Sequence, residues 1–373
     1  MGYLDGLRGL AAAIVVIHHF VQAFLPGMKE IPLLNLLYAG NLSVCIFFVL
    51  SGYVLTYRYF KTGDQETLVS GAVRRYPRLL PPVLITILLA LVLMNLSLFS
   101  NIQAGEVIGS EWLQGFWTFN SSFPDAIGEA LWGVWFNGEN SYDCVMWTLT
   151  TEFTGSLIAF AFVMLFGRQP YRWIAYLIAS IYFWDSYTLG FILGVLLADL
   201  YHTETPGTHA KPVYAMLLVY GLVLGSWDTI TTKNMDLITW IFHLQNNEPL
   251  TTVHTIAAFL ITLGVLNLPQ LKTILSRRVF TYLGRISFSM YLVHMLVLGS
   301  VTSTTFLILH NNGVSYTVSV ITATLISIPV ILAASHLITR YIDQPGITLS
   351  KTFYQKLKTD SHTGTRTASL PRE

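Results

Sequence analysis

Residues 4–20 read LDGLRGLAAAIVVIHHF, and this stretch places Arg8 and His19 on one otherwise apolar segment. Eleven residues at about 100° each end within roughly 20° of three full turns, so a helix here presents both side chains on one face, about 16 Å apart. A histidine at that distance from the surface lies near the middle of a hydrocarbon core about 30 Å thick. Polar side chains at this depth are costly unless the helix lines a polar cavity, so the pair marks a candidate functional site.

The rest of the chain has the composition of an integral membrane protein. Of its 373 residues, 53% are hydrophobic and 11% are charged, and the mean hydropathy is +0.56. Apolar runs predict an all-α membrane fold with about ten transmembrane helices. The fifth and sixth runs are short and adjacent, so they are either two spans or a re-entrant pair. The runs lie near residues 8–25, 35–57, 79–99, 146–166, 172–185, 187–201, 212–227, 252–268, 287–309 and 315–338.

The basic residues predict the orientation of these spans. If the N-terminus is cytoplasmic, every Lys and Arg except Lys29 and Lys233 falls on the cytoplasmic side, as the positive-inside rule requires. Both termini are then cytoplasmic. Residues 100–145 contain acidic residues but no Lys or Arg, which predicts a lumenal or extracellular loop. Asn120 opens an Asn-Ser-Ser triplet there, a glycosylation acceptor on the correct side of the membrane.

The same loop is rich in Trp and Phe, so it is either an aromatic belt in the membrane interface or a lid over an acceptor pocket. We expect one transmembrane domain over residues 1–346. Residues 347–373 are polar and rich in Ser, Thr and Lys, which predicts a partly disordered cytoplasmic tail.

Several classes of site are not expected. No basic stripe remains once the charges are assigned to loops, so no nucleic-acid partner is predicted. Cys45 and Cys144 provide neither a disulfide framework nor a metal-ligand spacing, and no metal is expected. No P-loop or dinucleotide fingerprint occurs.

Polar residues recur at intermediate depth in other predicted spans. Ser51 and His294 each lie about 9–10 Å from the predicted cytoplasmic surface, whereas Glu152 lies about 9 Å from the opposite surface and about 21 Å from the cytoplasm. With His19, four helices therefore supply polar side chains to the middle layer of the membrane.

Six short motifs, in this order and on these sides of the membrane, resemble those of the acyltransferase 3 family. The resemblance covers residues 2–346, and the chain length and tryptophan-rich loop are similar to the fungal members. Two positions depart from the usual motifs, Thr148 in place of Ser and Asp343 in place of Glu. The motifs are residues 3–19 (YLDGLRGLAAAIVVIHH), 46–52 (IFFVLSG), 74–81 (RRYPRLLP), 147–152 (WTLTTE), 283–294 (LGRISFSMYLVH) and 340–345 (RYIDQP).

The resemblance implies transfer of an acyl group, usually acetyl, from cytoplasmic acyl-CoA to a hydroxyl of the acceptor. The family's functional arginine and histidine map onto Arg8 and His19. A histidine within reach of a hydroxyl can take its proton during attack on the thioester, an effect of typically 10²- to 10⁴-fold, so His19 is the expected general base. Arg8 is expected to contact acyl-CoA; the alternative is a snorkelling anchor paired with Asp5.

Coenzyme A carries phosphates that suit arginine forks. Arg74, Arg75 and Arg78 are further candidates for binding them; alternatively, this triplet only fixes topology and binds anionic lipids. Ser51 is a candidate on the cofactor side, although Ser51 and Gly52 also suit close helix packing.

Glu152 and His294 complete the candidate catalytic set. Glu152 either orients the acceptor hydroxyl or a catalytic imidazole, or forms a structural pair across helices. His294 either holds the thioester or lines the acceptor channel, or it packs through a backbone carbonyl.

The sequence therefore favours a multi-pass O-acyltransferase that uses acyl-CoA, most simply acetyl-CoA, and a small-molecule hydroxyl acceptor such as a fungal secondary metabolite. A glycan acceptor is the variant within this class. A transporter of about ten helices is the alternative from another class, but the motifs of residues 1–60 do not recur in residues 146–345, as matching halves would require.

Overall fold

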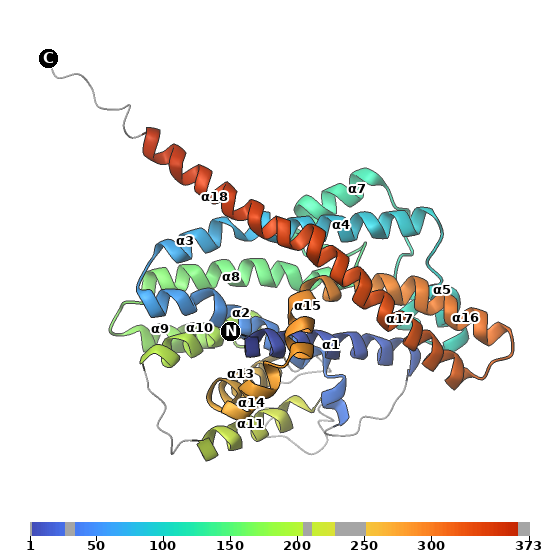
Figure 1. Cartoon of the computed structure of the whole chain (residues 1–373), viewed down its shortest axis with the longest axis horizontal. Coiled ribbons are helices and arrows are strands. Elements are labelled where there is room, and N and C mark those ends of the chain that lie inside the picture. The colour runs from blue at the N-terminus through green and yellow to red at the C-terminus, as the bar shows by residue number, and fades with distance from the viewer. Residues whose placement is uncertain (1, 27–33, 204–210, 228–250, 365–373) are drawn as a thin grey trace.

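The computed structural model describes residues 2–26, 34–203, 211–227 and 251–364, and every regular element in these ranges is helical (Figure 1). Six helical segments are long and apolar enough to cross a membrane, or seven if the bent pair α13 and α14 forms one span. The predicted all-α membrane fold is confirmed at this level. The larger helices are α1 (Gly2–Phe24), α2 (Gly40–Thr62), α3 (Glu66–Val73), α4 (Arg75–Asn95), α8 (Trp147–Phe166), α9 (Arg172–Tyr182), α10 (Thr188–Thr203), α11 (Lys211–Gly225), α13 (Thr251–Asn267), α14 (Pro269–Leu275), α15 (Arg278–Val297), α16 (Ser303–Asn311), α17 (Tyr316–Ile338) and α18 (Gln344–Gly364).

Small residues hold α1 against α15. A Cβ atom added at Gly284 would lie 2.0 Å from the carbonyl oxygen of Asp5, and one added at Gly9 would lie 2.4 Å from the backbone nitrogen of Gly284. Only glycine permits this approach, the usual device for packing helices in lipid. The contact fixes the face of α1 that carries the candidate site relative to α15.

The contact between α2 and α10 is built in the same way. A Cβ at Gly52 would lie 2.2 Å from the carbonyl oxygen of Phe191, and one at Gly194 would lie 2.1 Å from that of Val49. The predicted packing role of Gly52 is confirmed. Its neighbour Ser51 faces the candidate site instead, as described below.

Residues 100–145 form a folded cap rather than a free linker. The cap contains α5 (Asn101–Ile108), α6 (Glu111–Gln114), α7 (Phe123–Gly128), a π-helix η2 (Glu129–Asn137) and the start of η3 (Cys144–Met146). Buried Trp117 and Trp135 donate from Nε1 to the carbonyl oxygens of Tyr142 (2.9 Å) and Ala130 (2.8 Å). Indole rings satisfied in this way stabilise a defined conformation of the cap.

The fifth and sixth predicted spans correspond to α9 and α10. α9 has 11 residues, or about 16 Å of helix, which is roughly half a hydrocarbon core. Arg172 at the start of α9 pairs with Asp199 of α10 (2.5 Å) and binds the two helices together. The count of about ten spans remains a prediction.

The helix of the last predicted span continues beyond residue 338. α17 continues through the π-helix η7 (Thr339–Asp343) into α18, which projects from the bundle beyond α3 (Figure 1). The Tyr354 hydroxyl and the Lys358 ammonium of α18 both donate to Glu66 of α3, at 2.8 and 2.7 Å. Most of the segment predicted as a tail is thus helical, and residues 365–373 lie outside the described residues.

Candidate active site

Arg8 and His19 lie on the single helix α1, as the spacing predicts. Arg8 lines a cavity of about 340 Å³ between α1, α2, α4, α8 and α15, with η7 and the start of α18. Four other candidate residues line the same space: Ser51, Arg75, Arg78 and Glu152. We call it the arginine cavity. Its volume is within the ordinary range of small-molecule sites.

Two partly buried guanidinium groups in the arginine cavity have no ion-pair or hydrogen-bond partner among the described residues. Neither Arg8 nor Arg78 makes a side-chain hydrogen bond or ion pair with any residue in the described ranges, and Nε of Arg78 is buried without an acceptor. Asp5 and Asp343 also line the cavity, and neither forms an ion pair there. A buried guanidinium without an acceptor is costly, so this cavity suits an anionic ligand.

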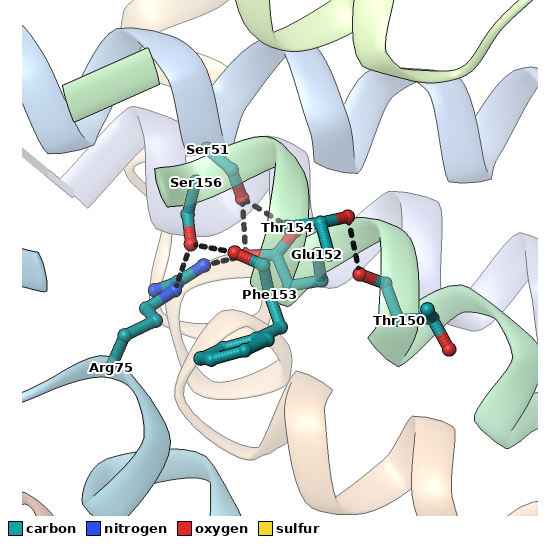
Figure 2. A network of polar contacts seen from close by, with 7 residues as sticks. All are labelled: Ser51, Arg75, Thr150, Glu152, Phe153, Thr154 and Ser156. Atoms are coloured by element: carbon teal, nitrogen blue, oxygen red, sulfur yellow. Dashed lines mark hydrogen bonds and ion pairs between the residues drawn. The ribbon is translucent and has the colours of Figure 1, made fainter. Parts of the chain in front are cut away.

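Glu152 of α8 is held by side chains from two other helices, α2 and α4 (Figure 2). Its carboxylate forms an ion pair with Arg75 of α4 and accepts hydrogen bonds from Ser51 Oγ of α2 at 2.9 and 3.1 Å. Arg75 Nε also donates to Ser156 Oγ (2.9 Å), whose hydroxyl donates to the Phe153 carbonyl (2.7 Å). Of the interpretations that the sequence leaves open for Glu152, the structure shows pairing across helices.

His19 and His294 contact each other directly. Nδ1 of His19 lies 2.7 Å from Nε2 of His294, and Nδ1 of His294 lies 3.1 Å from the carbonyl oxygen of Met290, one turn earlier on α15. The two imidazole planes differ by 18° and their centroids are 5.0 Å apart, so the rings are joined edge to edge by a nearly coplanar hydrogen bond. His294 is completely buried, whereas His19 is partly exposed.

The cap reaches this pair through Trp112 of α6. Its indole ring lies nearly parallel to the His19 imidazole, with 11° between the planes and 5.7 Å between the centroids. The aromatic loop therefore contacts a candidate catalytic residue, which an aromatic belt in the membrane interface would not need to do.

The arginine cavity and the histidine pair are neighbours but not one space. Neither histidine lines the cavity; Phe47 and Tyr291 do, and the Tyr291 ring lies 5.8 Å from that of His294. The Tyr291 hydroxyl is fixed by the Val145 carbonyl (3.2 Å) and by Thr148 Oγ (3.0 Å). Tyr291 thus forms the wall between the two parts of the site.

The structure leaves one candidate apart from the others. Arg74 does not line the arginine cavity, and its guanidinium donates to Ser70 Oγ on the preceding turn (3.3 Å). Three residues that the sequence analysis did not single out also shape the site, namely Ser156, Tyr291 and Trp112. Ser156 had a signal, because it lies one turn after Glu152 and shares its helix face.

The sequence matches the acyltransferase domain family over residues 1–336, which is most of the chain. The chain belongs to the acyltransferase 3 family. The matched range contains the histidine pair and every arginine that lines the cavity, and it leaves out Asp343 and α18.

Two similar proteins extend this result. The O-acetyltransferase PaAT-1 of Phomopsis amygdali is 26% identical over 95% of this chain and 84% of its own length. The acyltransferase MdmB of Streptomyces mycarofaciens is 27% identical over 79% of this chain and 78% of its own length. No solved structure matches the chain. The protein is therefore a multi-pass membrane acyltransferase, similar over nearly its whole length to an O-acetyltransferase.

Proposed function

We propose that this acyltransferase moves an acetyl group from acetyl-CoA to a hydroxyl group of a small-molecule acceptor. One observation carries the proposal: α1 presents an uncompensated guanidinium in a cavity at one end and a hydrogen-bonded imidazole about three turns further along. The first group suits the phosphates of coenzyme A, and the second suits deprotonation of a hydroxyl. Acetyl is the acyl group proposed because a relative that matches 95% of this chain is named an O-acetyltransferase.

In this proposal Arg8 and Arg78 bind the phosphates of the donor. Their guanidinium groups have no partner in the described part of the chain, so no protein contact must break before they bind. Arg75 keeps Glu152 neutralised and forms the wall of the cavity, with Ser51 beside it. The predicted contacts of Arg74 and Arg75 with phosphate stay predictions.

In this proposal the extended pantetheine arm carries the thioester from the arginine cavity past Phe47 toward His19, which requires the Tyr291 side chain that separates the two spaces to move aside. The acceptor hydroxyl gives its proton to Nε2 of His19 while its oxygen forms a bond to the thioester carbonyl carbon. The bond from that carbon to sulfur breaks, and the departing thiolate takes the proton from His19. The products are the ester and free coenzyme A, and His19 is returned to its starting state.

The proposed topology has about ten spans with both termini in the cytoplasm, so acetyl-CoA enters the arginine cavity from the cytosol. The acceptor approaches His19 from the side of the cap, where Trp112 provides an aromatic surface. A secondary metabolite with a hydroxyl on an apolar skeleton suits that surface.

The acceptor is found by metabolite profiling of a strain that lacks the gene, with the gene reintroduced as wild type or as His19→Ala. We expect one compound to lose an acetyl mass increment in the deletion strain and to regain it only with wild type. An acetylated glycan as the affected product would replace the small-molecule acceptor. Restoration by His19→Ala would refute the mechanism.

Donor binding is tested separately on protein purified in detergent with radiolabelled acetyl-CoA. We expect Arg8→Gln and Arg78→Gln to weaken binding about tenfold or more, because each loses a charge-assisted phosphate contact. Arg278→Gln is the matched control, since Arg278 is exposed at the start of α15 and does not line the cavity. Equal binding by all three variants would contradict the proposed donor site.

A further inference from the structure

We infer that His294 is a positioning residue that holds His19 in the tautomer with its proton on Nδ1, so that Nε2 carries the free lone pair. This inference rests on the proposed function, in which His19 is the general base. It assigns to His294 a role that differs from holding the thioester or lining the acceptor channel.

The hydrogen-bond chain fixes the direction of each donor. A carbonyl oxygen only accepts, so the contact of Met290 with His294 requires the proton of His294 on Nδ1. In the neutral ring, Nε2 of His294 is then an acceptor. The 2.7 Å contact with His19 therefore requires a proton on Nδ1 of His19, which leaves Nε2 of His19 unprotonated.

The surroundings hold this arrangement in place. His294 is fully buried, its ring lies 5.8 Å from that of Tyr291 on the preceding turn of α15, and both of its ring nitrogens make hydrogen bonds that oppose rotation. His18 adjoins His19 along α1, but its Nδ1 donates to the Tyr38 carbonyl (2.8 Å) and does not compete for His19. Trp112 stacks on the His19 ring and restricts its rotation.

The arrangement acts on the transition state as well as on the resting enzyme. When Nε2 of His19 accepts the proton from the acceptor hydroxyl, the ring becomes a cation whose Nδ1 proton still points at the lone pair of His294. His294 stabilises that cation without taking a proton, and the proton on Nε2 passes to the departing thiolate. No proton is gained or lost by the pair over the reaction.

A neutral partner is the economical choice inside a membrane. A carboxylate in the place of His294 would orient the base equally well, but it would add a charge to the apolar interior. The carboxylate supplied by α8, Glu152, is already paired with Arg75. An imidazole that donates to its own helix supplies the acceptor at no net charge.

The tautomer can be measured without any substrate. Nitrogen-15 NMR of the full-length protein with labelled histidine distinguishes protonated from unprotonated ring nitrogens, and the His19 signals are assigned by their loss in His19→Gln. We expect Nδ1 of His19 to be protonated and Nε2 unprotonated in the wild type. The opposite tautomer in the wild type would overturn the inference.

Two variants then connect the tautomer with activity. His294→Phe fills the same space without an acceptor, so we expect mixed tautomers and a loss of acetylated product of roughly 10²-fold or more. His294→Gln presents a carbonyl oxygen to Nδ1 of His19. It should therefore restore a large part of the single tautomer and of the acetylated product. His336→Gln is the control, because His336 is exposed near the end of α17.

Different results would refute the proposed function and the positioning role of His294. If His19→Ala still makes product, the proposed function is wrong whatever the tautomer. If His19→Ala is inactive but His294→Phe makes product at the wild-type level, the positioning role alone is wrong.

Discussion

At one end of α1, Arg8 faces a cavity whose arginines outnumber their protein partners, whereas about three turns away His19 lies in a neutral chain of hydrogen bonds beneath an aromatic cap. The first region invites an anion, and its unpaired guanidinium groups are costly until one binds. The second region is fully organised without a ligand. This difference indicates that the protein separates binding of the charged donor from the chemistry on the hydroxyl.

The largest expected effect is at the histidine end. His19→Ala removes the proposed base, so acetyl transfer should fall by roughly 10²- to 10⁴-fold. Membrane insertion and protein abundance should stay unchanged, and His336→Gln should behave as wild type. Product formation by His19→Ala at the wild-type rate would show that His19 is not the base and that the histidine end of α1 serves only binding.

The next largest effect is expected on stability, from the ion pair between Arg75 and Glu152 in the wall of the arginine cavity. Glu152→Leu leaves the buried guanidinium of Arg75 without its ion pair. We therefore expect the free energy of unfolding to fall by about 3–5 kcal/mol. The double variant Arg75→Leu with Glu152→Leu should recover most of that loss, because it leaves no buried charge. Thermal unfolding in detergent measures both. A single variant as stable as wild type would show that the pair is structurally unimportant.

A smaller effect is expected from Arg8→Lys, because an ammonium replaces the charge but not the fork of donors. The KM for acetyl-CoA should rise about tenfold while the KM for the acceptor changes little. If both rise equally, Arg8 anchors α1 and the electrostatic contrast between the two ends has no functional meaning.

The smallest effect concerns Asp143, where the cap joins α8. Burial raises the pKa of this carboxyl well above the usual value of 3.8, and its Oδ2 has no hydrogen-bond partner among the residues that the structure describes. The folded state therefore binds more protons at this carboxyl than the unfolded state, so the contribution of Asp143 to stability is fully present below the usual pKa of 3.8 and is lost as the pH rises through the raised pKa. The free energy of unfolding of Asp143→Asn should be about 1 kcal/mol higher than that of wild type at neutral pH, and it should depend less on pH. A pH dependence unchanged from wild type would show that Asp143 is charged in the folded protein.

Local periodicity made part of the site predictable. The spacing of Arg8 and His19 fixes their common face because a helix repeats every 3.6 residues, and the structure keeps both on α1. This result needs only the helix geometry. The predicted depths of Ser51 and Glu152 do not indicate their contact, because they are counted from opposite surfaces of the membrane, yet the two side chains form a direct hydrogen bond.

Contacts between distant helices were not predictable from the sequence. His19 and His294 are separated by 275 residues, and nothing local to either indicates that their rings meet. The sequence also does not show that Arg75 turns to Glu152 whereas Arg78 stays without a protein partner, since both belong to one basic run. Apolar composition gives the start of α9 at residue 172, but it places the end at residue 185, three residues beyond the last residue of the helix.

The central claim is that one end of α1 binds the donor and the other end acts on the hydroxyl. It is tested most directly by equilibrium binding of acetyl-CoA to Arg8→Gln and His19→Ala, measured side by side on purified protein. The account predicts that Arg8→Gln loses affinity by about tenfold or more whereas His19→Ala binds the donor as tightly as wild type. Loss of binding in His19→Ala, or wild-type binding in Arg8→Gln, would contradict it.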